Sequence, residues 1–346
     1  MLTRSRYGIL SLLLSLSCVF AAARAEKLQN SALPDTDADG ISDALEQRLL
    51  VQFAPSFKIA AHDCAGVPAE FEPGTAKPTV REQNSTIYGQ VSRAQSFTTK
   101  NPELEIRYFH LWATDCGKHG HPLDAEHVSV LVAASQSDME AATWKAVYWY
   151  AAAHENTVCD VSQIARASTL GPDDKGVPVW ISPGKHASYF SETLCHAGCG
   201  ADRCEAMTPL TITAVINLGE PGKPMQGAAF LSSPQWPLAT KMGATNFPEP
   251  SVARLELMPD SDIAWANPGR HPAQGIIADS SVVADAIAES GHNTTDAVSG
   301  ASDSTGNALS TSARKTKHAL SKSAKNVGKA LGIKPSSNQA RKQQSQ

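Results

Sequence analysis

Short apolar or alternating runs recur along the middle of the chain, from about residue 56 to about residue 267. Pro, Gly, Asn and Asp separate these runs, which cover residues 105–112, 127–133, 144–152, 177–182 and 210–218. Several short strands with turn residues between them are typical of a β-sandwich or a β-barrel. The pattern therefore predicts one mainly β domain over residues 54–268.

A helical period precedes this domain. Leu45, Leu49, Leu50 and Phe53 recur at a spacing that places them on one face of a helix over residues 44–53. Pro55 follows and is expected to end the helix, because proline cannot continue it. We expect the apolar face of this helix to pack inward.

The first 25 residues have the three parts of a secretory signal peptide. Arg4 and Arg6 precede an apolar run over residues 7–22, and residues 23–25 have the small-x-small pattern that signal peptidase recognises. We expect cleavage after residue 25, which gives a secreted or periplasmic mature protein.

The cysteines support an exported protein. Apart from Cys18 there are six, an even count that favours disulfides in an oxidising compartment, namely Cys64, Cys116, Cys159, Cys195, Cys199 and Cys204. The sequence leaves their pairing open. The alternative is a zinc site formed by Cys195, Cys199, Cys204 and His196, although this spacing lacks the paired Cys-x2-Cys form of a zinc ribbon.

Charge divides the chain into an acidic body and a basic end. Of the 30 Lys and Arg residues, nine follow Asp303, where no Asp or Glu occurs, and three lie in the first 25 residues. Between these segments 18 basic residues face 34 acidic ones, a balance of −16. Such an acidic body suits cation binding and argues against nucleic acid as a partner.

Residues 269–346 are rich in Ala, Ser, Thr, Asn and Gly, and they contain no aromatic residue. This composition predicts a disordered low-complexity tail, because it offers too little apolar surface to offset the entropy of ordering. Within it, Leu320, Ala324, Val327 and Leu331 would line one face of a basic helix. Such a helix touches anionic membranes or cell-wall polymers, and the alternative is a solvated tail.

Residues 35–46 fit the twelve-residue calcium-binding pattern of EF-hand loops. Carboxylates occupy positions 1, 3, 5, 9 and 12, and glycine occupies position 6, where the chain bends sharply. The predicted ligands are Asp35, Asp37, Asp39, the carbonyl of Ile41, Asp43 (directly or through water) and Glu46. Five carboxylates this close repel one another without a cation, so we expect Ca²⁺ as a cofactor.

The segment that precedes this loop is short and ends in Pro34, so an entering helix is not expected. The loop therefore resembles the Asp-rich repeats of thrombospondin type 3 and dockerin-like modules, in which only the exit helix is needed. The calcium ion is expected to fasten the start of the domain and to take no part in chemistry.

A second group of ligand-type residues lies at the start of a predicted strand. Asp124 and Glu126 are two apart in an extended segment, so their side chains share a face. His121, expected in the preceding turn, and Asp115 complete the group. Carboxylates with one imidazole suit Ca²⁺, Mg²⁺ or Mn²⁺. We therefore predict a second divalent-cation site at Asp115, His121, Asp124 and Glu126.

Residues 120–128, GHPLDAEHV, resemble the GHRHDWE heptad of the necrosis-inducing protein (NLP) cytolysin family. The wider layout of residues 45–250 is similar to the vacuolar protein sorting-associated protein 62 family, through FAP at 53–55, PVWI at 178–181 and GKHA at 184–187. These resemblances imply a two-sheet β-sandwich with a divalent cation at one rim, held by the four residues named above. Pro122, Leu123 and Ala125 replace Arg, His and Trp of the heptad, which puts cytolytic activity in doubt.

Three functions stay open at this point. The first is a secreted, non-enzymatic protein that recognises a lipid head group or a glycan at a cell surface through its metal rim. The second is a metal-dependent extracellular hydrolase, in which His154 or His186 acts as a general base toward a metal-bound water. The third is a structural envelope protein. Because Gly-x-Ser-x-Gly and His-Glu-x-x-His motifs are absent from the sequence, we favour a protein without enzymatic activity.

Overall fold

The computed structural model describes residues 33–94, 100–117, 119–199, 202–260 and 263–267. The chain divides into two compact units, residues 1–285 and 286–346, and all described residues belong to the first. The predicted signal peptide and the predicted tail lie outside the described residues.

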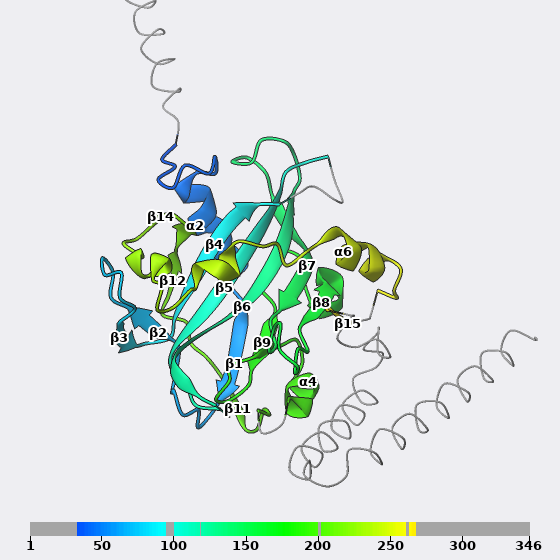
Figure 1. Cartoon of the computed structure of the whole chain (residues 1–346). Helices are drawn as coiled ribbons and strands as arrows, with labels where there is room; N and C mark the ends of the chain where they lie inside the picture. Colours follow the sequence, from blue (N-terminus) through cyan, green and yellow to red (C-terminus); the bar gives the residue numbers. More distant parts are fainter. Residues whose placement is uncertain (1–32, 95–99, 118, 200–201, 261–262, 268–346) are drawn as a thin grey trace, which may run out of the picture. The chain divides into compact units, whose positions relative to one another are not determined.

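The larger of two main sheets has seven strands, in the order β12-β4-β5-β6-β7-β8-β15 (Figure 1). In chain order they are β4 (Thr86–Arg93), β5 (Glu103–Asp115), β6 (His121–Ala134), β7 (Trp144–Ala151), β8 (Gln163–Arg166), β12 (Ala214–Asn217) and β15 (Ile263–Trp265). All neighbours are antiparallel except β12 and β4, which run parallel.

The smaller main sheet has four strands, in the order β10-β9-β1-β11. They are β1 (Ser56–Ala60), β9 (Pro178–Ile181), β10 (Ser188–Tyr189) and β11 (Met207–Pro209). Two-stranded sheets are formed by β2 (Ala69–Phe71) with β3 (Val80–Gln83), and by β13 (Gly219–Glu220) with β14 (Lys223–Pro224). The fold is mainly β, as predicted.

The core lies between the two main sheets. Alternate residues of β5 and β6, such as Ile106, Tyr108 and Val130, pack there against Phe57 of β1 and Val179 of β9. The opposite face of the large sheet carries two further apolar clusters, which are covered partly by the β2–β3 hairpin and partly by the last helix. The two-sheet β-sandwich is therefore confirmed.

The helices are short. They are α2 (Asp43–Gln52), α3 (Ala167–Leu170), α4 (Glu192–Ala197), α5 (Ala239–Met242), α6 (Glu249–Glu256) and the 3-10 helix η1 (Ala229–Ser232). No described helix is long and apolar enough to span a membrane. The predicted helix is confirmed as α2, and its four apolar residues (Leu45, Leu49, Leu50 and Phe53) are fully buried in the main core.

The four predicted rim ligands lie on the long antiparallel pair β5–β6, whose register sets their relative positions. Its register joins Trp112 to Asp124 and His110 to Glu126, so Asp124 and Glu126 occupy alternate positions, as predicted. The pairing continues to Asp115 opposite His121. His121 is therefore the first residue of β6, and its predicted place in a preceding turn is wrong, because the two strands stay paired beyond the apolar run.

The six cysteines form three disulfides, Cys64–Cys116, Cys159–Cys199 and Cys195–Cys204. The alternative zinc site at Cys195, Cys199 and Cys204 is therefore wrong, because each of these sulfur atoms is already bonded to another sulfur. Disulfides of this number are typical of proteins that fold in an oxidising compartment outside the cytosol.

Candidate functional site

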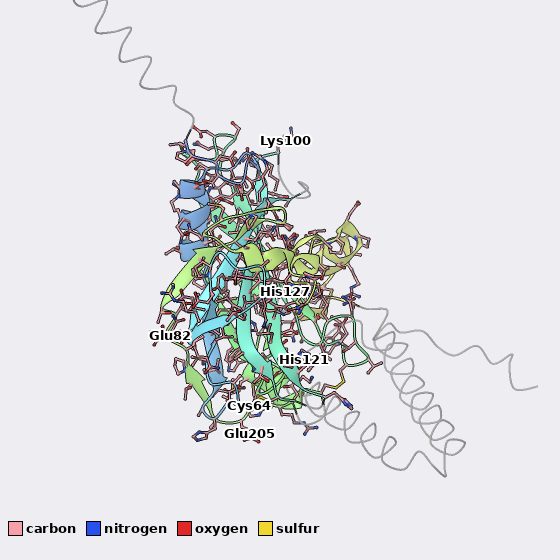
Figure 2. The ribbon with its side chains drawn as sticks, turned by 60° about the vertical axis from the view of Figure 1, so that its left-hand side comes forward. Cys64, Glu82, Lys100, His121, His127 and Glu205 are labelled. Atoms are coloured by element: carbon pink, nitrogen blue, oxygen red, sulfur yellow. A yellow bond between two sulfur atoms is a disulfide. The ribbon has the colours of Figure 1, made fainter. Side chains whose placement is uncertain are left out.

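Two candidate sites lie at different ends of the sandwich. The Asp35 loop (residues 35–46) precedes α2, which packs against β4 and β12 at one end (Figure 1). The rim, where β5 joins β6, lies at the other end, where Figure 2 shows His121 and Cys64 far from Lys100.

The Asp35 loop is bent by hydrogen bonds from its own backbone. The carboxylate of Asp35 accepts hydrogen bonds from the backbone N–H groups of Asp39 (3.2 Å) and Gly40 (3.0 Å). Ala38 and Gly40 have positive φ angles of 59° and 84°, the left-handed conformation that glycine adopts without strain. This bend turns alternate carboxylates toward a common centre.

The structure brings the predicted carboxylates together. Ligand oxygens of Asp35, Asp37 and Asp39 lie within 4.8 Å of one another, and so do those of Asp37, Asp43 and Glu46. Asp37 belongs to both groups, so the five carboxylates form one cluster. Ile41 lies among them with its side chain fully buried in the core.

Four carboxylate oxygens in this cluster are buried without a hydrogen-bond partner among the described residues. They are both oxygens of Asp37, Oδ2 of Asp39 and Oε1 of Glu46. Asp37 is 2% exposed and Glu46 is fully buried. A buried, unpaired carboxylate oxygen costs several kcal/mol, on the order of the desolvation of a charge. The donor set therefore fits a hard divalent cation, which takes six to eight oxygen ligands.

Burial and mutual repulsion destabilise the charged form of the loop carboxylates in the absence of a cation. Burial, followed by the neighbouring Asp37 carboxylate, raises the pKa of Glu46 to about 8. Burial, followed by Asp39 and Asp35, raises the pKa of Asp37 to about 6. A bound cation would stabilise both carboxylates in their charged form.

At the rim, the imidazole of His186 lies between two carboxylates. Its Nδ1 is 2.8 Å from Oδ2 of Asp124, and its Nε2 is 3.3 Å from Oδ1 of Asp63. The ring stacks on Trp112 at 3.9 Å between centroids and 7° between planes. Burial alone would lower the pKa of His186, but the hydrogen bonds and charges of Asp124 and Asp63 raise it to about 9. The ring is therefore an imidazolium at neutral pH.

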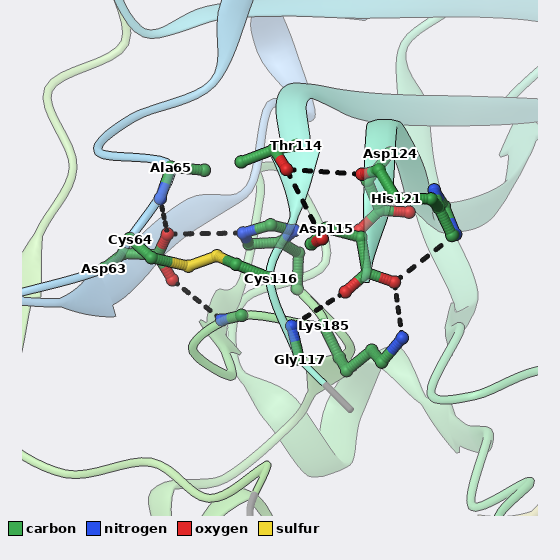
Figure 3. Close-up of a disulfide and its surroundings, with 12 residues drawn as sticks. Asp63, Cys64, Ala65, Thr114, Asp115, Cys116, Gly117, His121, Asp124 and Lys185 are labelled. Carbon is green, nitrogen blue, oxygen red and sulfur yellow. Dashed lines mark hydrogen bonds and ion pairs between the residues drawn. A yellow bond between two sulfur atoms is a disulfide. The ribbon is translucent and has the colours of Figure 1, made fainter. Parts of the chain in front are cut away.

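Asp115 forms a second group beside the Cys64–Cys116 disulfide (Figure 3). Its Oδ1 accepts a hydrogen bond from the backbone N–H of Gly117 at 2.9 Å. Its Oδ2 pairs with the ammonium of Lys185 at 2.5 Å and lies 3.4 Å from Nε2 of His121. Asp115 and His121 are thus brought together as predicted, but a lysine joins them.

Glu126 of β6 and His154, which follows β7, form a third group at the rim. Oε1 of Glu126 lies 3.4 Å from the ammonium of Lys241, while Oε2 is buried without a hydrogen-bond partner among the described residues. Burial raises the pKa of Glu126, and Lys241 opposes this shift. His154 pairs with Asp202, which outweighs burial and raises the pKa of the imidazole.

The four predicted rim ligands are therefore distributed over three separate pairings. Asp115 pairs with both His121 and Lys185, Asp124 pairs with His186, and Glu126 pairs with Lys241. Within the described ranges, no three of these four residues place ligand atoms within 4.8 Å of one another. A cation at the rim would have to replace lysine ammonium groups.

Backbone strain gathers around the rim. His119, Leu123, His154 and His186 all have positive φ angles, between 52° and 64°. A side chain in this conformation costs on the order of 1–2 kcal/mol. Strained residues of this kind cluster at functional sites, where the surroundings hold them in place.

Sequence reasoning did not find Asp63, Lys185 or Lys241. Asp63 and Asp115 each directly precede one cysteine of the Cys64–Cys116 disulfide, so the correct pairing would have placed both acids at the rim. Lys185 directly precedes His186, which was singled out. Lys241 comes from α5, and no local signal links it to β6.

The comparisons with known proteins give structural neighbours and no family. No protein-family model matches this chain. No curated protein matches it either.

Among solved structures, NLPPya in complex with mannosamine is similar at 16% identity and a TM-score of 0.32, over 58% of this chain and 89% of that chain. A non-toxic HaNLP3 protein is similar at 13% identity and a TM-score of 0.30, over 59% and 86%. Necrosis and Ethylene inducing Protein 2, from the causal agent of cocoa's witches' broom disease, is similar at 14% identity and a TM-score of 0.31, over 62% and 99%.

The structural neighbours of this chain are thus necrosis and ethylene-inducing toxin-fold proteins, at low identity and partial coverage. TM-scores this low assign neither a function nor membership of a family. The resemblance to the vacuolar protein sorting-associated protein 62 family stays a prediction.

Proposed function

We propose that this chain is an exported calcium-binding β-sandwich protein, with its calcium ion in the Asp35 loop. The observation that carries the proposal is the group of four buried carboxylate oxygens on Asp37, Asp39 and Glu46 that have no partner among the described residues. Neutral hydrogen-bond donors would leave the charge uncompensated, whereas a divalent cation satisfies all of these oxygens at once.

Calcium in this position stabilises the sandwich. Glu46 belongs to α2, and Ile41 and Leu45, which precede it in the chain, are fully buried in the main core. Neutralising the carboxylates therefore fixes the helix whose apolar face closes one end of that core. The role is structural, and it adds binding free energy to folding free energy.

The test is a calcium titration by calorimetry on exported protein that has been freed of metal. Wild type is expected to bind calcium, and Asp37→Asn is expected to lose this binding, because it removes a charge from a buried position in the loop. Asp174→Asn, the same change at an exposed residue, is the matched control and is expected to bind as wild type. Absence of calcium binding by wild type would refute the proposal.

The rim favours a second function, recognition of a glycan or a lipid head group. Its support is the unpartnered Oε2 of Glu126 together with the strained residues around it. Asp115, His121, Asp124 and Glu126 would hold a divalent cation there only after the three carboxylates leave their pairings with Lys185, His186 and Lys241. The cation would then supply a coordination position for a hydroxyl or phosphate oxygen. Lys185 and Lys241 would then be released to bind the ligand.

Glu126→Gln separates this second function from the first. The variant keeps the size of the side chain and removes the charge, so it is expected to lower the metal content from two ions to one and to leave the calcium loop filled. Binding of glucosamine and mannosamine, the sugars named with NLPPya structures, is then measured with and without metal. One ion in both proteins and no sugar binding would reject the rim site.

A hydrolase receives less support from the geometry. His154 and His186 are the candidate general bases, and the pKa values of both imidazoles are raised by carboxylate partners. At His186, whose pKa is raised to about 9, a protonated imidazole has no free lone pair with which to accept a proton from water. We therefore propose a protein without enzymatic activity.

A further inference from the structure

Glu220 lies outside the Asp35 loop in sequence but beside it in space. It ends the two-residue strand β13, and its Oε1 is buried without a hydrogen-bond partner among the described residues. Burial raises the pKa of Glu220, and so do the carboxylates of Asp39 and Asp37. One oxygen of Glu220 and three oxygens of these two loop acids are thus buried without a hydrogen-bond partner among the described residues.

The segment before Glu220 contacts the loop directly. Nδ2 of Asn217 donates a hydrogen bond of 3.0 Å to Oε2 of Glu46. Gly219 approaches so closely that a Cβ atom there would lie 3.0 Å from Oδ2 of Asp37. Residues 217–219 therefore lie against two of the predicted calcium ligands, Asp37 and Glu46.

A chain of hydrogen bonds orients Glu220. Nη1 of Arg107 donates to Oε1 of Gln90 at 3.0 Å, which fixes the direction of that amide. The amide nitrogen of Gln90 then donates to Oε2 of Glu220 at 3.0 Å. One oxygen of Glu220 is held by the sheet, and the other remains free.

Asp43 belongs to the carboxylate cluster of the loop but also takes part in hydrogen bonds within it. Asp43, at position 9, accepts hydrogen bonds from the backbone N–H of Thr36 (2.7 Å) and from its hydroxyl group (2.6 Å), one on each carboxylate oxygen. These bonds occupy Asp43 in closing the loop. A calcium ion with six to eight oxygen ligands therefore has room for a carboxylate from elsewhere.

We propose that Glu220 supplies this carboxylate, so that the calcium ion is held between the Asp35 loop and the β13–β14 hairpin. The inference rests on the proposed function, because it requires the loop to bind calcium. The loop is then no independent module, and its affinity depends on the sandwich. Calcium then joins the start of the described chain to the β13–β14 hairpin. In chain order this hairpin comes after every strand of the two main sheets except β15.

The experiment measures the calcium dissociation constant of full exported protein, freed of metal, for three glutamate variants. Glu220→Gln keeps the hydrogen bond to Gln90 and is expected to weaken binding by about tenfold or more. Glu220→Asp keeps the charge but withdraws the oxygen, and it is also expected to weaken binding. Glu82→Gln, at an exposed position on β3, is the control and is expected to bind as wild type.

The outcomes are distinguishable. If wild type binds calcium and Glu220→Gln binds it equally well, Glu220 is no ligand and the proposed function stands. If Glu220→Gln weakens binding but Glu220→Asp does not, the effect is one of charge alone, and ligation is overturned. If wild type binds no calcium, the proposed function itself fails. Circular dichroism of each variant shows that it is folded.

Discussion

Gly219 lies where a side chain has no room. Its φ angle is +66°, and a Cβ atom would lie 2.7 Å from Cγ of Met225 and 3.0 Å from Oδ2 of Asp37. Gly219→Ala is therefore expected to displace the Asp37 carboxylate and to weaken calcium binding several-fold. It should also lower the free energy of unfolding by more than the roughly 1–2 kcal/mol of left-handed strain alone.

Gly74→Ala is the matched control for this prediction. Its φ angle of +76° gives a similar strain, but nothing lies within 4 Å of the added atom. It is expected to lower stability slightly and to leave the calcium dissociation constant unchanged. Equal calcium affinities in the two variants would show that Gly219 does not hold Asp37 in place.

His186 is expected to be the most sensitive single residue of the rim. His186→Gln removes the positively charged imidazolium that lies between Asp63 and Asp124, and it leaves these two carboxylates without their ion-pair partner. Removing one partner of a buried ion pair costs about 3–5 kcal/mol, so chemical denaturation should show a loss of this order. His62→Gln, the same change at an exposed residue, should leave the unfolding free energy unaltered.

For single site residues, the sequence predicts those that belong to a local pattern and misses those that lie far away in the chain. The spacing of the Asp35 loop identified every carboxylate of the cluster, because all of them lie within twelve residues. Asn217 reaches Glu46 of that cluster through tertiary packing alone, and Glu220, proposed as a further ligand, comes from the same segment. For the same reason the lysines that neutralise Asp115 and Glu126 were not foreseen.

Among the elements, the disulfides are expected to differ in how much each contributes to the free energy of unfolding. Cys64 and Cys116 are 52 residues apart and tie the loop after β1 to the end of β5, whereas Cys195 and Cys204 are only 9 apart. By loop-closure entropy the first contributes about 4 kcal/mol and the second about 2.6 kcal/mol.

Two paired variants check this order. Cys64→Ser with Cys116→Ser should lower the midpoint of denaturant unfolding more than Cys195→Ser with Cys204→Ser does. The reverse order would mean that the shorter link holds native contacts that loop entropy does not describe.

The elements that the apolar pattern predicted are the long central strands β5, β6 and β7 and the helix α2, because their burial on one face repeats over many residues. Short strands such as β10 and β13 have only two residues and leave no period to detect. The pairing of β1 with β9 is parallel and joins residues about 120 positions apart, so the local sequence gives no indication of it.

For the whole molecule, the stability of metal-free protein is expected to depend on pH through the Asp35 loop. The folded pKa values of Glu46 (about 8) and Asp37 (about 6) exceed the ordinary values of 4.5 and 3.8. Between the ordinary and the folded pKa of each group, the folded state therefore binds more protons than the unfolded state. The stability that these protons contribute is lost as the pH rises through the two folded pKa values.

Denaturant unfolding at about pH 5 and about pH 8 tests this expectation. Metal-free protein should be less stable at the higher pH, and saturating calcium should remove the difference, because the ion replaces the protons. A metal-free protein that gains stability over this range would mean that other groups dominate. Asp37→Asn, which lacks one of the two acids, should show a smaller dependence on pH.

The stacking of Trp112 on the imidazolium of His186 also has a spectroscopic consequence. A protonated imidazole in contact with an excited indole accepts an electron from it and quenches its emission. Trp112, which is fully buried, is therefore expected to emit weakly in the native state. Any event that separates the two rings, such as a ligand that enters the rim or the opening of the β5–β6 end, is expected to increase the emission of Trp112. The fluorescence of Trp112 therefore reports on the state of the rim.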